Sequence, residues 1–216
     1  MSSPRFKYPR TPHLPWSPGI ADDDIRAATT AVFAGKEVIV TEKMDGENTT
    51  MYPDYIHARS IDGRHHPSRD RVKGLHASIG YMIPQGWRLC GENLYARHSI
   101  PYERLRGYFY LFAIWEEQNV SLGWGDVEEW SARLGLPTPP VLYRGLWDEA
   151  RIRAIDVDPA ISEGYVVRNA GSFRFDAFAE NIAKWVRKGH VQTDEHWMTS
   201  AIVPNVLASD EELTKE

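Results

Sequence analysis

One stretch of the sequence, from Tyr108 to Trp115, constrains the fold more than any other. It is an unbroken apolar and aromatic run of strand length, which is typical of a central strand covered on both faces. Apolar residues also recur at three- and four-residue steps from Val72 to Met82 and from Val127 to Leu134, as on the buried face of a helix. Strands scattered among a few helices favour an α+β domain of antiparallel β-sheets flanked by helices.

Several shorter runs complete the expected secondary structure. Val38–Thr41 and Thr49–Tyr52 flank a polar turn that contains Asp45 and Gly46, and they therefore predict a β-hairpin. The other expected strands are Tyr55–Ser60, Trp87–Ala96, Val141–Tyr143, Ser162–Arg168 and Ile182–Lys188. The further expected helices are Ile25–Phe33, which ends at Gly35, Trp147–Ile155 and Glu195–Ile202.

Length and composition indicate a single domain over residues 1–216. Hydrophobic residues make up 42% of the chain, enough for one sizeable core. Residues 1–36 are expected to form a proline-rich arm and a short helix, 37–190 the core, and 204–216 a frayed tail. Many aromatic residues in the arm favour packing over the domain, and the alternative is that Pro12–Trp16 lines one wall of a site.

The charge and the cysteine content limit which partners and which cellular location are expected for the protein. The net charge is −5, so a global basic field is absent and any contact with nucleic acid must come from a local patch. The basic segment Arg64–Lys73 is either a solvated loop or a phosphate-contacting loop, and its paired histidines lack neighbouring metal ligands. The single cysteine, Cys90, excludes an intrachain disulfide, and no apolar run reaches membrane-spanning length. A soluble, cytoplasmic protein without membrane contact is expected.

A lysine at the mouth of the expected turn, Lys43, is the leading candidate for chemistry. A lysine amine can act as a covalent nucleophile when it is neutral, and a nearby cation such as Lys184 or a bound Mg²⁺ would lower its pKa. Attack on a nucleoside triphosphate would also need basic partners for phosphates, carboxylates for a metal and a ribose, and an aromatic face for a base. The chain offers such groups in Arg59, Lys184, Arg187 and Lys188, in Glu163 and Glu92, and in Phe112 or Tyr110. Taken singly, each also has a structural explanation as a solvated lysine, a surface carboxylate or a core aromatic.

The order of six short motifs resembles that of the covalent nucleotidyltransferases, which comprise ATP-dependent DNA ligases, RNA ligases and mRNA capping enzymes. The motif sequences are most similar to those of the ATP-dependent RNA ligases that resemble RNA ligase 2. The resemblance spans roughly residues 40–190. One K-x-D-G motif alone is weak evidence for this superfamily, whereas six motifs in the order typical of the superfamily are specific evidence for it. The motifs are Lys43-Met44-Asp45-Gly46, Ala58-Arg59-Ser60, Gly91-Glu92-Asn93-Leu94-Tyr95, Tyr110-Leu111-Phe112-Ala113-Ile114, Glu163-Gly164-Tyr165-Val166-Val167-Arg168 and Ala183-Lys184-Trp185-Val186.

This resemblance implies a nucleotidyltransferase domain that uses ATP with Mg²⁺ or Mn²⁺ and joins RNA 3′-hydroxyl and 5′-phosphate ends. Lys43 would form a lysyl-AMP intermediate, and the AMP would then pass to the RNA 5′-phosphate before the 3′-hydroxyl displaces it. The implied catalytic residues are Lys43, Lys184 and Glu163, and Glu163 would also place the metal, through water. The implied nucleotide-binding residues are Glu42 near the adenine edge, Lys43, Arg59, Glu92 on the ribose, Phe112 on the adenine face, Glu163, Lys184 on the α-phosphate and Lys188.

Two departures from the family pattern bear on these expectations. Relatives often carry a second lysine two places after Lys184, where this chain has Val186, and Arg187 or Lys188 would substitute. No oligonucleotide-binding barrel is evident on either side of the motifs. Binding of nicked or broken RNA, or of an RNA/DNA hybrid, is therefore expected either to be weak or to be strengthened by a partner protein. The alternatives are a minimal DNA or RNA/DNA-hybrid ligase and a noncatalytic module that binds nucleotides or RNA ends.

Overall fold

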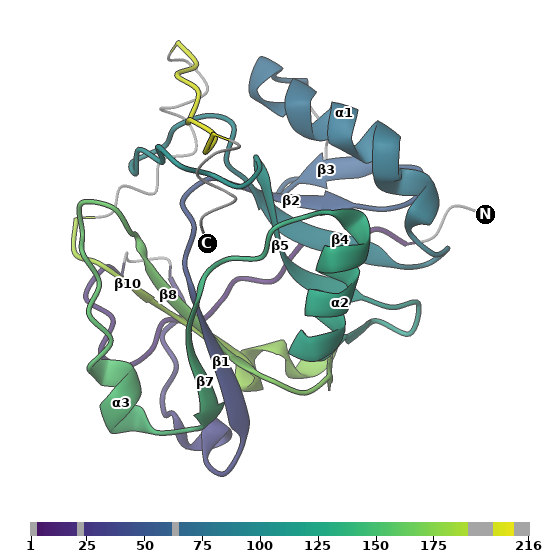
Figure 1. The fold of residues 1–216 in the computed structure, drawn as a ribbon. Helices are drawn as coiled ribbons and strands as arrows, with labels where there is room; N and C mark the ends of the chain where they lie inside the picture. Colours follow the sequence, from purple (N-terminus) through teal and green to yellow (C-terminus); the bar gives the residue numbers. More distant parts are fainter. Residues whose placement is uncertain (1–3, 21–23, 62–64, 190–200, 210–216) are drawn as a thin grey trace.

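Two antiparallel sheets form the framework of the molecule (Figure 1). The computed structural model describes residues 4–20, 24–61, 65–189 and 201–209. The four-stranded sheet has the order β10-β8-β1-β7, with β1 (Glu37–Glu42), β7 (Val141–Leu146), β8 (Gly164–Asn169) and β10 (Ile182–Val186). The six-stranded sheet has the order β3-β2-β4-β5-β6-β9, with β2 (Glu47–Met51), β3 (Ile56–Ala58), β4 (Arg88–Asn93), β5 (Phe109–Trp115), β6 (Val120–Ser121) and β9 (Phe173–Arg174).

Two helices, α1 (Asp70–Ile79) and α2 (Trp124–Leu134), pack against the six-stranded sheet (Figure 1). Strand β5 lies inside this sheet, between β4 and β6, and buries every side chain except that of Phe112, which is half-buried. The expectation of a central, doubly covered strand is thus confirmed. Its side chains reach clusters on both faces of the sheet, and the register shift that pairs Cys90 with Ala113 but Gly91 with Leu111 interrupts their regular alternation at Phe112. Leu111 and Ile114 pack with the two helices, and Ala113 and Trp115 pack with the ring of Phe178 on the other side.

The four-stranded sheet has its own apolar cluster. Val38 and Val40 of β1 pack there with Val167 of β8, and Ile152 of α3 (Glu149–Arg153) and Leu14 of the N-terminal arm close over them. The N-terminal arm comprises the described residues 4–20 and 24–36 and lies along β10, with hydrogen bonds to its backbone. Short 3-10 helices complete the fold: η1 (Ala31–Phe33), η2 (Pro67–Arg69), η3 (Gly80–Met82) and η4 (Phe175–Glu180).

The hairpin expected around Asp45 and Gly46 is wrong, because β1 and β2 belong to different sheets. Both edges of β1 are occupied by β7 and β8, while β2 pairs with β3 and β4. The segment 43–46 therefore crosses from one sheet to the other. A turn signal between two strands predicted local pairing, whereas strands distant in the sequence provide the partners.

The expected helix at Ile25–Phe33 is also wrong, since only Ala31–Phe33 forms a single 3-10 turn. The backbone of residues 25–27 is used instead by the arm: the N–H of His13 donates to the carbonyl of Ile25, and the N–H of Ala27 donates to the carbonyl of His13. The helices predicted before Met82 and before Gly135 are confirmed, and Gly135 ends α2 in the left-handed conformation with φ of 64°.

Residues 201–209 pack on the loop that follows β4, although the sequence predicted a frayed tail from residue 204. The side-chain nitrogen of Asn205 donates to the carbonyl of Leu94 at 2.8 Å, and the N–H of Arg97 donates to the carbonyl of Val203 at 2.8 Å. That prediction is wrong for residues 204–209, and residues 210–216 lie outside the described ranges. Most of the helix expected at Glu195–Ile202 also lies outside them, and Ala201 and Ile202 are not helical.

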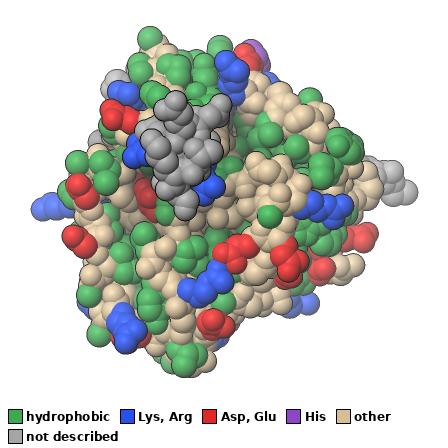
Figure 2. All heavy atoms as spheres, in the orientation of Figure 1, with side chains coloured by type: hydrophobic (Ala, Val, Ile, Leu, Met, Phe, Trp, Pro, Cys, Tyr) green, Lys and Arg blue, Asp and Glu red, His purple; other side chains and the backbone are tan. Residues whose placement is uncertain are grey.

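Charged side chains of both signs are interspersed over the face shown in Figure 2, and neither sign forms a continuous field there. This distribution agrees with the net charge of −5. The longest helix in the described part of the chain is α2, with 11 residues, and none there has the length and apolarity needed to cross a bilayer.

Candidate active site

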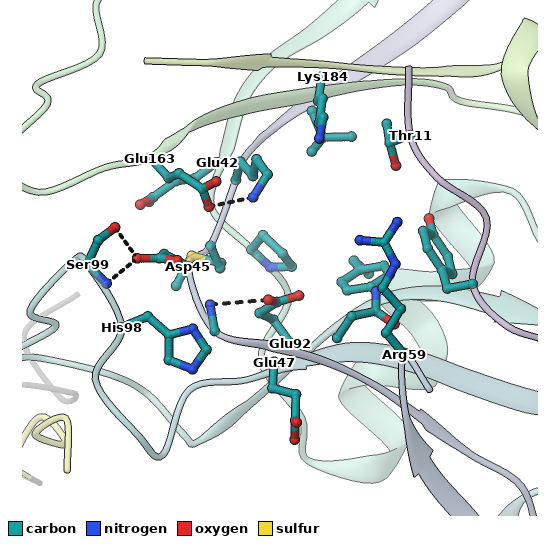
Figure 3. A pocket seen from close by; sticks show the side chains of 18 of the residues that line it. Thr11, Glu42, Asp45, Glu47, Arg59, Glu92, His98, Ser99, Glu163 and Lys184 are labelled. Atoms are coloured by element: carbon teal, nitrogen blue, oxygen red, sulfur yellow. Dashed lines mark hydrogen bonds and ion pairs between the residues drawn. The ribbon is translucent and has the colours of Figure 1, made fainter. Parts of the chain in front are cut away.

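A cavity of about 1330 Å³ lies where the two sheets meet, and residues of the N-terminal arm form part of its wall. Lys184 and Glu163 approach it from the four-stranded sheet, and Glu92 and Arg59 approach it from the six-stranded sheet (Figure 3). Every residue to which the sequence assigned nucleotide binding lines this one cavity. These residues are Glu42, Lys43, Arg59, Glu92, Phe112, Glu163, Lys184 and Lys188.

Lys43 follows β1 directly and is fixed at its backbone, where its N–H donates to the carbonyl of Gly164 at 2.8 Å. Its ammonium group forms an ion pair with Glu163, whose carboxylate is almost fully buried. Burial lowers the pKa of Lys43, but the carboxylates of Glu163, Glu92 and Asp45 raise it more, so the net shift is upward. This differs from the sequence expectation of a lysine pKa lowered by neighbouring cations: the surrounding carboxylates keep Lys43 charged.

Glu92 of β4 lies on the opposite wall of the cavity. Its Oε1 accepts a hydrogen bond from the N–H of Gly46 at 3.1 Å. Burial raises its pKa to about 8, repulsion from Glu163 and Asp45 acts in the same direction, and attraction to Lys43 offsets part of the shift. The cavity thus concentrates carboxylates around one lysine, and their mutual repulsion favours a bound cation or a shared proton.

Asp45 has a structural role in the motif (Figure 3). Its Oδ2 accepts three hydrogen bonds, from the backbone N–H of Ser99 at 2.7 Å, from the Ser99 hydroxyl at 2.6 Å and from the N–H of Ile100 at 2.9 Å. Its own N–H donates to the Tyr102 hydroxyl at 2.9 Å. Asp45 therefore ties the loop after β4 to the Lys43 segment, and it forms part of the cavity wall without reaching across to Lys184.

Lys184 lies on β10, and Lys188 lies just after the end of this strand. The ammonium group of Lys184 is 3.6 Å from Asp24 Oδ1, and burial followed by repulsion from Lys43 lowers its pKa. Of the two residues proposed to substitute for the second lysine of the motif, Lys188 lines the cavity and Arg187 does not. Val186, at the motif position itself, is fully buried in the apolar core.

The aromatic candidates separate clearly. Phe112 lines the cavity, and Tyr8 of the arm packs edge-on against it with ring centroids 5.2 Å apart. Tyr110 lies in a different cluster under the 94–108 loop, where its hydroxyl accepts from the N–H of Arg106 at 2.9 Å. Phe112 is therefore the candidate base platform, and Tyr110 is a core residue.

Sequence reasoning missed several residues that line the cavity. Asn48 has a buried Oδ1 without a hydrogen-bond partner in the described part of the chain, so it is available to a ligand. Arg168 donates to the carbonyl of Phe112 at 3.2 Å and stabilises the strand that carries the aromatic ring. Arg168 lies inside the fifth motif and Asn48 lies two residues after the first, so the chemistry of both could have been considered. Asp24 of the arm had no such signal, because only the pairing of the arm with β10 brings it to the cavity.

Within the described residues, the carboxylate of Glu163 beside Lys43 is the donor group considered for a divalent ion. No cluster of three His, Cys, Asp or Glu residues suited to a metal occurs within residues 4–20, 24–61, 65–189 and 201–209. Carboxylate oxygens are nevertheless the ligands that Mg²⁺ and Mn²⁺ prefer, and Glu163 presents one beside Lys43. A metal held here would thus share its coordination among phosphate, water and Glu163.

Comparison with known structures places this arrangement in a known fold. A Naegleria gruberi RNA ligase solved with PPi is 22% identical, with a TM-score of 0.53 over 72% of this chain and 51% of that chain. A variant of the same ligase solved with ATP and Mn is 19% identical, with a TM-score of 0.51 over 73% and 51% of the two chains. An archaeal ATP-dependent RNA ligase is 20% identical, with a TM-score of 0.52 over 74% and 45%. The chain therefore spans about half the length of these structures and shares the fold of their nucleotidyltransferase domain.

Sequence comparison identifies the family. No curated protein sequence matched the chain significantly. The family model described as RNA ligase matches residues 36–186, which include both sheets and every motif residue named above. Since the match covers well over half of the chain, the protein belongs to the RNA ligase family.

Proposed function

We propose that the protein is an ATP-dependent RNA ligase that seals RNA 3′-hydroxyl and 5′-phosphate ends through a covalent Lys43–AMP intermediate. The observation that carries this proposal is the convergence of Lys43, Glu163, Glu92 and Lys184 on one cavity, although they come from four separate segments of the chain. Taken singly, each of these residues has a structural explanation. Their convergence around a single lysine supports a common reaction.

In the first step, Lys43 loses its proton and its Nζ attacks the α-phosphorus of ATP. A P–N bond forms, the bond from the α-phosphorus to the bridging oxygen breaks, and pyrophosphate leaves. Glu163, already paired with the ammonium group, is the nearest acceptor for the proton. Lys184 stabilises the charge that develops on the α-phosphate, and Arg59 and Lys188 bind the outgoing phosphates. Glu163 would hold a Mg²⁺ or Mn²⁺ ion through water, and such an ion would neutralise further phosphate charge.

The nucleoside would lie between the two sheets. In this proposal the half-buried face of Phe112 stacks on adenine, and Glu92 accepts hydrogen bonds from the ribose hydroxyls. Glu42, half-buried next to the nucleophile, lies at the adenine edge in this proposal, and partial burial raises the pKa of its carboxyl group. These contacts orient the α-phosphorus toward Lys43, which is the main contribution of positioning to a phosphoryl-type transfer.

In the later steps the AMP passes to an RNA 5′-phosphate, and a 3′-hydroxyl then displaces it to form the phosphodiester. The cavity exceeds the roughly 300–1,000 Å³ of ordinary small-molecule sites, which leaves room for an RNA end beside the nucleotide. Arg10, Arg59 and Arg97 supply local positive charge along its wall. Because the net charge of −5 gives no general attraction for RNA, we expect a partner protein to increase the affinity for nicked or broken RNA ends.

The decisive test is covalent labelling. Purified protein is incubated with Mg²⁺ and α-labelled ATP, and in parallel with α-labelled GTP, and acid-sensitive, base-stable label on the protein is measured. Label from ATP alone is expected. Absence of label from a folded protein free of bound AMP would overturn the proposal in favour of a noncatalytic nucleotide- or RNA-end-binding module.

The nucleophile is tested by substitution. Lys43→Arg retains a cation among the three carboxylates but offers a group that stays protonated, so the fold is expected to persist while label falls below detection. Undiminished label in this variant would place the nucleophile elsewhere. Nicked duplexes with RNA, DNA or mixed strands at the ends then identify the substrate, and sealing of DNA ends alone would replace the RNA ligase assignment with a minimal DNA ligase.

A further inference from the structure

The N-terminal arm extends the four-stranded sheet beyond β10. The N–H of Leu14 donates to the carbonyl of Lys184 at 2.7 Å, and the N–H of Lys184 donates to the carbonyl of Pro12 at 2.8 Å. Further along, the N–H of Gly19 donates to the carbonyl of Val186 at 2.9 Å. The arm precedes residues 36–186, which the RNA ligase family model matches. Its backbone is nevertheless bonded to Lys184 and Val186, two of the four residues of the final motif on this strand.

This pairing brings three arm side chains into a buried row that ends at the cavity. Ser17 Oγ accepts from the N–H of Val186 at 2.9 Å and lies 2.8 Å from Nδ1 of the fully buried His13. His13 Nε2 lies 3.1 Å from Asp24 Oδ2, and Asp24 Oδ1 lies 3.6 Å from the ammonium group of Lys184. Asp24 is thus in contact with an imidazole on one side and with the cavity lysine on the other.

We propose that Asp24 is a positioning residue that fixes the ammonium group of Lys184 at the cavity wall, with His13 as the buried support for its carboxylate. The inference deepens the proposed function, and in its kinetic consequence it rests on that function. It assigns a role in the site to the arm, outside the segment that carries the family motifs.

Charge explains why a carboxylate belongs at this point. A carboxylate that faced a phosphate directly would repel it, so an acidic residue beside a phosphate site must act on a cation. Within the described residues, the charged groups that face Lys184 are Lys43 and Arg59, which repel it, and Asp24 and Glu163, which attract it. Glu163 is already engaged by Lys43. Asp24 is therefore the carboxylate that compensates Lys184 and limits the conformations of its flexible side chain.

His13 supports Asp24 as a neutral ring. Burial, followed by repulsion from Lys184, lowers its pKa to about 4, although Asp24 acts in the opposite direction. The arrangement fits a tautomer in which Ser17 donates to Nδ1 and the ring proton on Nε2 faces Asp24. One oxygen of Asp24 then faces His13, and the other remains directed at Lys184.

The first experiment measures the position of Lys184 without relying on catalysis. Full-length protein is briefly acetylated with acetic anhydride, and the modification of each lysine is quantified by mass spectrometry with Lys73 on α1, outside both the arm and the cavity, as the internal reference. Asp24→Ala should raise the modification of Lys184 several-fold, because it exposes the amine and removes the charge that favours the protonated form. Asp24→Asn, which keeps the shape and one acceptor oxygen, should give a smaller rise.

A matched control separates positioning from general loosening of the arm. Arg26 lies on the same segment and donates to the carbonyl of Pro15 at 2.7 Å, but it is exposed and does not line the cavity. Arg26→Ala should leave the modification of Lys184 unchanged. The inference is overturned if the modification of Lys184 is unchanged in Asp24→Ala or rises equally in Arg26→Ala. If Asp24→Ala fails to fold, Asp24→Asn replaces it as the test variant.

The second experiment measures catalysis. The rate of Lys43 adenylylation at saturating ATP should fall about tenfold or more in Asp24→Ala, recover in part in Asp24→Asn and stay unchanged in Arg26→Ala, with a smaller change in the apparent KM for ATP. A normal rate in Asp24→Ala contradicts the inference while the proposed function stands. If the wild-type protein forms no adenylate, the proposed function fails, and the acetylation result still decides whether Asp24 positions Lys184.

Discussion

Lys43 is surrounded by carboxylates that stabilise its charged form, and this has a direct kinetic consequence. In the proposed reaction the attacking species is the neutral amine of Lys43, and the pKa of Lys43 is raised because Glu163, Glu92 and Asp45 outweigh the effect of burial. Below that pKa the neutral fraction grows about tenfold per pH unit. The rate of adenylylation at saturating ATP should therefore rise steeply from about pH 6 to about pH 8. Single-turnover labelling at fixed ionic strength measures it, and a flat profile would show that deprotonation of Lys43 does not limit the step.

Glu92 links the same cluster to stability. Its pKa is raised from 4.5 to about 8, chiefly by burial, so the folded state binds more protons than the unfolded state between these values. Its contribution to stability is thus lost as the pH rises through this window. Glu92→Gln keeps an acceptor for the N–H of Gly46 but cannot ionise. Relative to the wild type, the variant should gain stability with rising pH, by about 1 kcal/mol or more near pH 8.

Thermal or urea unfolding of both proteins at several pH values between about 5 and 8 measures this difference. Titrating groups far from the cavity contribute equally to the two proteins, so subtracting the two profiles isolates Glu92 together with its coupling to Lys43 and Glu163. A constant difference across the range would show that the carboxyl group titrates normally.

At the residue scale, the sequence identified site residues best where a side chain of suitable chemistry also stood at the expected place in the order of motifs. Lys43, Glu92, Phe112, Glu163 and Lys184 were each ambiguous alone, and their order along the chain selected them together; the structure brings them to one cavity. Their catalytic roles remain predictions. Asp24 could not have been chosen in this way, because its position depends on a pairing between the arm and β10 that no local pattern encodes.

At the element scale, local signals succeeded and non-local ones failed. The apolar repeat before Met82 and the glycine after Leu134 are both local signals, because each concerns residues that lie a few positions apart in the sequence. Both helices form as predicted. The hairpin failed because sheet partners are set by contacts far apart in sequence: Thr41 of β1 pairs with Val166 of β8. The helix predicted at Ile25–Phe33 failed for the same reason, since the arm takes up that backbone.

Gly164, the first residue of β8, is a strand position where a side chain would clash with the neighbouring strand. Its φ is +153°, and a Cβ there would lie 2.0 Å from the carbonyl oxygen of Trp185 on β10. Gly164→Ala should therefore push β8 and β10 apart, lower the free energy of unfolding by more than about 2 kcal/mol and displace Glu163 and Lys184 from Lys43.

Gly74 provides the opposite control, because it lies in α1 with nothing within 4 Å of its Cβ position. Gly74→Ala should raise the free energy of unfolding by roughly 0.5–1 kcal/mol and leave labelling unchanged. Denaturant unfolding and ATP labelling of the two variants test both signs. Equal stability of Gly164→Ala and the wild type would show that the two strands can separate without cost.

At the scale of the whole molecule, the site exists only where the two sheets meet. Segment 43–46 crosses between them, and each sheet brings part of the predicted nucleotide contacts: Lys184 and Glu163 from one, and Glu92 and Phe112 from the other. The two sheets also share apolar contacts, since Ile39 of β1 belongs to the cluster of Leu111 and Ile114 on β5, and Ile182 of β10 belongs to the cluster of Ala113 and Trp115. A bound nucleotide would therefore add contacts to both sides of a junction that is already packed.

This arrangement predicts that nucleotide binding stabilises the fold through both sheets at once. Saturating AMP should raise the unfolding temperature of the wild-type protein, because a ligand that binds only the folded state adds about 2.7 kcal/mol at 100 times its Kd. Glu92→Ala removes the contact from the six-stranded sheet and Lys184→Ala removes the one from the four-stranded sheet, and each should reduce the AMP-induced shift. Lys73→Ala on α1, outside the cavity, should leave it unchanged.

The informative comparison is between the two site variants. If AMP lies across both sheets, each substitution weakens binding by about tenfold, which removes roughly 1.4 kcal/mol of stabilisation. If AMP is held by one sheet alone, only the variant on that sheet loses the shift. Differential scanning fluorimetry over a range of AMP concentrations distinguishes these cases, because a weakened site recovers its shift at higher AMP whereas a lost site does not. A normal shift in Lys184→Ala would therefore assign the nucleotide to the six-stranded sheet and leave Lys184 with the triphosphate alone.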